Sequence, residues 1–91
     1  MRSRARTRRT DGDLAAGIVR AIHAMTAGRR KRAPRGCVQW AAAVEIRKGL
    51  GASEDEFNRA LAFGVSADWL NVNPGATHSI CIARDGWELV A

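Results

Sequence analysis

Apolar residues in the first two thirds of the chain recur at helical intervals, and they predict three helices. The first is expected to begin after a cap supplied by Asp11 or Asp13 and to end at Ala27-Gly28. Its apolar stripe follows the spacing i, i+4, i+7, i+8 and i+11, through Leu14, Ile18, Ala21, Ile22 and Met25. The second is expected from Cys37 to Leu50. Because it is apolar on most sides, it should be central in the domain.

The third helix has the clearest local signals. Ser53 is followed by Glu56 at the capping-box spacing, in which each side chain bonds the backbone N–H of the other residue. Gly49-Leu50-Gly51 separates this helix from the second one. The buried stripe should consist of Phe57, Ala60, Leu61, Gly64 and Val65. The exposed face should carry Asp55, Asn58, Arg59, Ala62 and Ser66.

Beyond the third helix the apolar residues alternate with polar ones, which predicts strands. Trp69–Asn73 and His78–Ala83 should form a hairpin around the Pro74-Gly75 turn. The alternation places two pairs of residues on opposite faces of the second strand, Ile80 and Ile82 against Ser79 and Cys81. Trp87–Ala91 fits either a short strand or one helical turn, and both alternatives stay open.

Charge is distributed unevenly along this chain of 91 residues, whose net charge is +6. Ten of the fifteen basic residues form two clusters: Arg2, Arg4, Arg6, Arg8 and Arg9, then Arg29, Arg30, Lys31, Arg32 and Arg35. Residues 36–91 hold four basic and seven acidic residues, a net charge of −3. We therefore expect a disordered basic arm over residues 1–10, one domain over residues 11–91, and a basic linker from Arg29 to Gly36. The two basic clusters favour a polyanionic partner such as nucleic acid.

The sequence contains no constellation typical of an enzyme. Its two histidines, His23 and His78, lack catalytic or zinc-binding spacing with Cys37 and Cys81, and no phosphate-binding glycine loop is present. We therefore predict no catalytic activity, no metal and no cofactor. Two cysteines do not make a disulfide framework, and no apolar run approaches the length of about 18 residues that a membrane span needs. A cytoplasmic protein without a membrane contact is expected. Among the tryptophans, Trp40 and Trp87 are expected in the core and Trp69 nearer the surface.

The order helix, helix, turn, helix, hairpin resembles the winged helix-turn-helix family. Four segments carry the resemblance: Leu50-Gly51-Ala52-Ser53 at the turn, Phe57 after it, Trp69-Leu70 opening the hairpin, and residues 80–87 closing it. The chain departs from the family pattern at Arg47, where a small residue is usual. The resemblance implies an α+β fold, with a three-helix helix-turn-helix core followed by a C-terminal β-hairpin wing. It also implies a third helix that enters the major groove, where Asn58 and Arg59 suit contacts to bases.

Acidic residues argue against DNA reading by the third helix itself. Glu54, Asp55 and Glu56 open this helix and repel phosphates, and the hairpin tip from Asn73 to His78 has no lysine or arginine. We therefore expect a transcription-associated accessory factor that binds nucleic acid, DNA rather than RNA, mainly through the two basic clusters. Those clusters have a second interpretation as solvated segments without a partner.

The alternative is a protein-interaction module on the same scaffold. DNA binding predicts that Arg29–Arg35 and Arg59 share one face, whereas a basic segment lying away from the third helix favours protein contacts. The sequence allows a homodimer through the first helix but does not require one.

Overall fold

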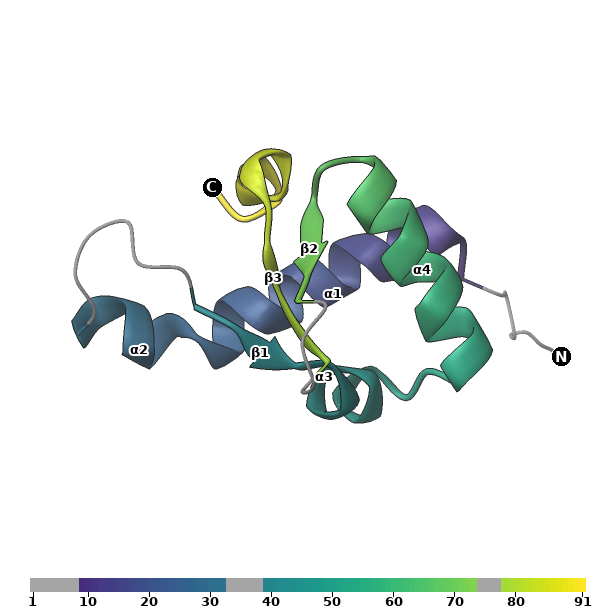
Figure 1. The fold of residues 1–91 in the computed structure, drawn as a ribbon, viewed down its shortest axis with the longest axis horizontal. Coiled ribbons are helices and arrows are strands. Elements are labelled where there is room, and N and C mark those ends of the chain that lie inside the picture. The colour runs from purple at the N-terminus through teal and green to yellow at the C-terminus, as the bar shows by residue number, and fades with distance from the viewer. Residues whose placement is uncertain (1–8, 33–38, 74–77) are drawn as a thin grey trace, which may run out of the picture.

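The computed structural model describes residues 9–32, 39–73 and 78–91, and in these residues the chain is α+β and mostly helical (Figure 1). The elements are α1 (Asp11–Met25), α2 (Ala27–Arg32), β1 (Ala41–Ala42), α3 (Ala43–Leu50), α4 (Glu54–Ser66), β2 (Leu70–Val72), β3 (Ser79–Ile82) and the 3₁₀ helix η1 (Arg84–Leu89). The strands form a small antiparallel sheet in the order β1-β3-β2.

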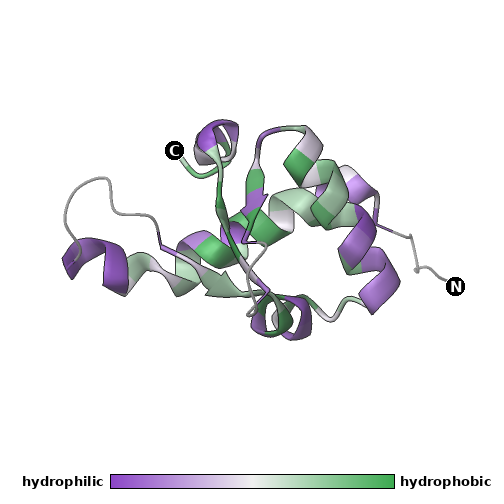
Figure 2. Ribbon diagram, viewed as in Figure 1, coloured by the Kyte–Doolittle hydropathy of each residue, from purple (hydrophilic) through white to green (hydrophobic). Residues whose placement is uncertain are grey.

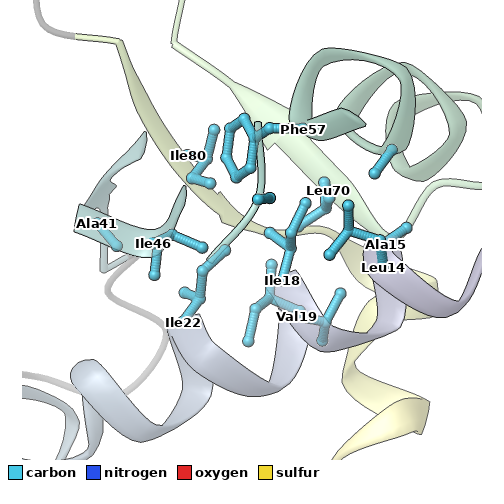
Figure 3. Packing of buried hydrophobic residues seen from close by; sticks show 13 residues of the cluster. Leu14, Ala15, Ile18, Val19, Ile22, Ala41, Ile46, Phe57, Leu70 and Ile80 are labelled. Atoms are coloured by element: carbon cyan, nitrogen blue, oxygen red, sulfur yellow. The ribbon is translucent and has the colours of Figure 1, made fainter. Parts of the chain in front are cut away.

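Helix α1 is the central element of the fold. Its inner face packs against α3, α4, β3 and η1, and Ile18, Val19 and Ile22 are fully buried there (Figure 3). The predicted stripe is confirmed at Leu14, Ile18 and Ile22, but Met25 at its end is 46% exposed. The prediction that the second helix is central is wrong, because Val44 of α3 is 47% exposed and of that helix only Ile46 is buried.

The first helix begins and ends elsewhere than predicted. Thr10, not Asp11 or Asp13, is the N-cap, and its side chain accepts a hydrogen bond of 3.0 Å from the backbone N–H of Asp13. The helical bonding continues past the expected stop, because the N–H of Thr26 donates to Ile22 (3.0 Å) and the N–H of Arg30 donates to Thr26 (2.9 Å). Gly28 disfavours a helix by only about 1 kcal/mol. Arg29–Arg32 therefore lie on a helix and not in a linker.

The second helix is shorter than predicted because a strand precedes it. Ala41 pairs with Ile80 and Ala42 with Ser79, and α3 begins only at Ala43. A short apolar run suits a strand or a helix equally well, and here the edge of β3 supplies partners for its backbone groups. The predicted start at Cys37 lies outside the described residues.

The turn and the capping box between α3 and α4 are confirmed. Gly51 takes the left-handed conformation (φ 64°) that ends many helices, and its N–H donates to the carbonyl oxygen of Lys48 at 3.1 Å. Ser53 and Glu56 bond each other's backbone N–H groups at 3.2 and 3.1 Å. Phe57, Ala60 and Gly64 are buried as predicted, whereas Val65 is exposed, so the stripe is narrower than predicted.

The predicted hairpin is confirmed as β2 and β3, which pair Leu70 with Ile82 and Val72 with Ile80. The half-buried pattern predicted for β3 is wrong, because Cys81 is buried like its neighbours. After β3 the chain forms η1, which decides the open alternative in favour of helical structure. Trp87 on η1 is 43% exposed and therefore lies outside the core, contrary to expectation. Trp40 and Trp69 are both half-buried.

Candidate nucleic-acid interface

Helix α2 is the most basic element of the described chain. It carries Arg29, Arg30, Lys31 and Arg32, and no acidic residue. Arg29, Lys31 and Arg32 are exposed, and none of the ion pairs among the described residues involves them. The helix extends from the end of α1 as a hydrophilic projection (Figure 2). Three cationic side chains at this end are therefore available to an anionic partner.

Arg30 differs from its neighbours on α2 because the fold uses its guanidinium group. Nη1 donates to the carbonyl oxygen of His23 at 2.8 Å and to the hydroxyl of Thr26 at 2.6 Å. The group also lies 5.6 Å from the ring centroid of Trp87, which is a cation–π distance. The ring of His23 meets the edge of the same indole at 6.0 Å. Arg30 thus attaches α2 to η1, a role that no local sequence pattern indicated.

The cations at the opposite end of α1 are also held within the fold. Arg59 of α4 forms an ion pair with Asp11 at 3.6 Å, and both side chains are about half exposed. Nη1 of Arg9 donates to the carbonyl oxygen of Leu50 at 3.1 Å, at the C-terminal end of α3, where a cation is favourable. Asn58 is exposed. The other residues of the predicted interface, Arg2, Arg4, Arg6, Arg8 and Arg35, lie outside the described residues.

The face formed by α4 and the hairpin has little positive charge. Glu54 and Asp55 are exposed at the start of α4, while the Glu56 side chain is used in the capping box. The described hairpin residues, 70–73 and 78–82, contain no lysine or arginine. Phosphate groups approaching this face would therefore meet carboxylates first.

Helix α1 separates the basic helix from α4. Asp11, the partner of Arg59, is the first residue of α1, whereas α2 follows its last turn. Figure 1 shows α2 and α4 at opposite ends of the molecule. The cations of Arg29–Arg32 and Arg59 are therefore not gathered on one face. The shared face that DNA binding predicts is not present among these described cations, and by the criterion drawn from the sequence their separation favours the protein-interaction alternative.

A cleft of about 420 Å³ lies between α3, the first half of α4 and the hairpin. Phe57 and Ile80, both buried, lie at its base, and Val44 and Val72 line it with exposed side chains. Glu54 and Arg47 add charges to the lining. The guanidinium of Arg47 donates to the carbonyl oxygen of Ala52 at 3.3 Å.

The remaining candidate chemistry is sparse in the described residues. They contain no group of three or more His, Cys, Asp or Glu side chains that could hold a metal ion. Burial raises the pKa of the Cys81 thiol above its ordinary value, although hydrogen bonds from Asn71 oppose the shift. In the same residues, no helix combines the length and apolar character needed to cross a membrane.

Comparison of the chain with models of known protein families, with curated proteins and with solved structures finds no match.

Proposed function

We propose that this protein is a winged helix-turn-helix protein that binds nucleic acid, DNA rather than RNA, through phosphate contacts made by α2. The family assignment is supported by the order of the elements: α1, then the α3–turn–α4 unit, then the β2–β3 hairpin. The left-handed Gly51 and the Ser53 capping box supply the turn that a helix-turn-helix needs. Strand β1 ties the helical part to the hairpin through β3.

The observation that carries the binding proposal is the set of exposed cations on α2, a helix without acidic residues; the separation of these cations from Arg59 favours the protein-interaction alternative. Exposed cations on α2 can neutralise phosphates and release the counterions bound to DNA, a contribution that does not depend on sequence. Helix α4 opens with carboxylates and its Arg59 is paired with Asp11. The binding mode is therefore backbone contact with little base reading. The arginines of the first cluster and Arg35 extend the basic charge along the sequence on either side of the α1–α2 segment.

The test is binding of a fluorescent DNA duplex, followed by anisotropy at several salt concentrations, for the full chain and a variant with Arg29→Gln, Lys31→Gln and Arg32→Gln. Each phosphate contact contributes about 0.9 to the slope of log K against log salt concentration. The variant should therefore lose up to about 2.7 from that slope. A matched control, Asn58→Ala with Arg59→Gln, should keep the wild-type slope and affinity.

A further variant assigns the contribution of the N-terminal arm, with glutamine at Arg2, Arg4, Arg6 and Arg8. It should lower the slope independently of the α2 variant, because different phosphates are contacted. Two outcomes would refute the proposal. One is an absence of salt-dependent binding by the full chain. The other is loss of binding in the α4 control while the α2 variant still binds like the wild type.

A further inference from the structure

We infer that the cleft between α3, α4 and the hairpin is a second interaction surface, which binds a peptide segment of a partner protein. The peptide presents a branched aliphatic side chain to the cleft and a lysine or arginine to Glu54. This inference goes beyond nucleic-acid binding by α2 and does not depend on it, because the cleft and α2 share no residue.

Two valines on different walls give the cleft exposed apolar surface. Val44 belongs to α3 and Val72 to β2, and they are 47% and 38% exposed. Phe57 and Ile80 form the base of the cleft beneath the valines. Both are buried and belong to the hydrophobic core. An aliphatic side chain inserted here would cover both valines and remove apolar surface from water. A volume of about 420 Å³ lies in the range of pockets that hold small ligands or a few side chains.

The side of α4 that lines the cleft is polar at its first residues and becomes apolar at Leu61 and Val65. Glu54, Asn58 and Leu61 line the cleft at helical spacing, and Val65 follows on the same side of α4. Val65 is exposed although it was expected in the core. The exposed aliphatic surface therefore extends along α4, which suits an extended or helical peptide better than a single small molecule.

Charge complementarity identifies the polar end of the peptide. Glu54 lines the cleft with an exposed carboxylate, and no ion pair among the described residues involves it. The next residue, Asp55, is also exposed but does not line the cleft. Arg47 lines the same cleft, and its guanidinium donates to the carbonyl oxygen of Ala52; the described residues Arg47 and Glu54 form no ion pair with each other. A lysine or arginine beside the aliphatic residue would complete this acidic corner.

The same features argue against nucleic acid as the occupant. Phosphates gain most from exposed cations, whereas this cleft has aliphatic walls and an exposed carboxylate, Glu54, that forms no ion pair among the described residues. The exposed cations of α2 lie at one end of the molecule, whereas α3 and the hairpin, which line the cleft, lie near its middle (Figure 1). A peptide with an aliphatic and a basic side chain satisfies both kinds of surface at once.

The experiment selects phage-displayed random peptides on the immobilised full chain and measures the affinities of the enriched synthetic peptides by fluorescence anisotropy. We expect the enriched peptides to share a branched aliphatic residue with a lysine or arginine within three positions of it. Their affinity should fall about tenfold or more for Val44→Ser with Val72→Ser, which removes methyl groups from both walls. The variant with glutamine at Arg29, Lys31 and Arg32 should bind these peptides like the wild type.

A second variant keeps the test decisive if the double-valine variant is poorly folded. Glu54→Lys leaves both valines in place, and it should weaken the binding of the basic peptides several-fold and improve the binding of matched peptides with glutamate in place of the basic residue. The inference is overturned if no peptide family is enriched, if the enriched family lacks the aliphatic–basic pair, or if the variants bind like the wild type. It is equally overturned if the valine substitutions abolish DNA binding, or dissociate a dimer detected by sedimentation of the wild type.

Discussion

Gly64 offers a sharp test of the packing between α4 and the sheet. It is buried in α4 and faces Leu70, the first residue of β2. A Cβ added at Gly64 would overlap Cδ1 of Leu70 and lie 3.0 Å from its Cγ. Leu70 is fully buried, so its side chain has no solvent space to move into. Gly64→Ala should therefore destabilise the protein, although alanine is the better helix former.

The magnitude follows from two opposing contributions. Overpacking a filled core costs about 1–3 kcal/mol, and replacing glycine by alanine inside a helix returns about 0.5–1 kcal/mol. The net loss should be about 1–2 kcal/mol, which lowers the melting temperature of a domain of this size by roughly 4–16 °C. Gly17→Ala in α1 is the matched control, because a Cβ there would lie 3.7 Å from Leu50, an ordinary contact. It should raise stability by about 0.5–1 kcal/mol.

Urea denaturation monitored by circular dichroism measures both variants against the wild type, with equal m-values required for the comparison. A double-mutant cycle adds Leu70→Val, which removes the Cδ1 atom that alanine at Gly64 would overlap. In that background Gly64→Ala should cost less than it does in the wild type. Overlap with Leu70 is refuted as the cause if Gly64→Ala has the same free energy of unfolding as Gly17→Ala. It is also refuted if Gly64→Ala lowers the free energy of unfolding by the same amount with and without Leu70→Val.

Three further predictions concern the cap, the basic helix and the buried thiol. Ser53→Ala removes half of the capping box and should lower the free energy of unfolding by about 1 kcal/mol in urea denaturation. Arg30→Gln should lower the melting temperature by an amount equivalent to about 1 kcal/mol, whereas Arg29→Gln on the same helix should stay within about 0.5 kcal/mol of the wild type. With Cys37 replaced by serine, Cys81 should resist a thiol reagent until urea unfolds the chain. Burial raises the pKa of Cys81 in the folded state. The stability that this shift contributes is therefore present below pH 9.0 and is lost as the pH rises through the folded-state pKa.

Helix α4 could be predicted from the sequence because its determinants are local. The capping box joins Ser53 to Glu56, and the left-handed Gly51 lies only three residues before Glu54. Such contacts are encoded within one or two turns and require no knowledge of the tertiary fold. The positions of the hairpin strands were predictable for the same reason, since apolar–polar alternation in the sequence is a property of a short segment, but the burial of Cys81 does not follow that alternation.

The differences between prediction and structure arise where distant residues decide the local conformation. Ala41 and Ala42 form a strand because β3, far along the chain, pairs with them. The helical conformation continues past Gly28 because Arg30 donates a hydrogen bond to the end of α1 and its guanidinium lies over the ring of Trp87. The spacing of residues in the sequence cannot identify β3 or Trp87 as the partner, because both contacts are tertiary and override weak local propensities.

The candidate interface shows the same division. Counting residues identified both basic clusters, but it could not separate the cations that the fold uses from those that remain exposed. Arg9 donates to Leu50, and Arg30 donates to His23 and Thr26. Arg59 forms an ion pair with Asp11. All of these contacts are set by the fold. The exposed cations of α2 are Arg29, Lys31 and Arg32. No sequence pattern distinguishes them from Arg30, whose guanidinium is bonded within the fold.

The length of α1 makes the two proposed surfaces electrostatically independent. Its 15 residues separate α2 from the Asp11–Arg59 pair by about 22 Å at the usual helical rise. Glu54 lies five residues before Arg59 on α4, about 7.5 Å along that helix, so it remains farther from α2 than the screening length of about 8 Å at physiological ionic strength, and the carboxylates at the start of α4 barely weaken the attraction between α2 and phosphate. The reverse also holds, because the cations of α2 do not repel a basic peptide from Glu54. One small domain can therefore present a polyanion-binding end and an acidic, apolar cleft without either opposing the other. Substitutions in one surface should change its own affinity and leave the other unchanged.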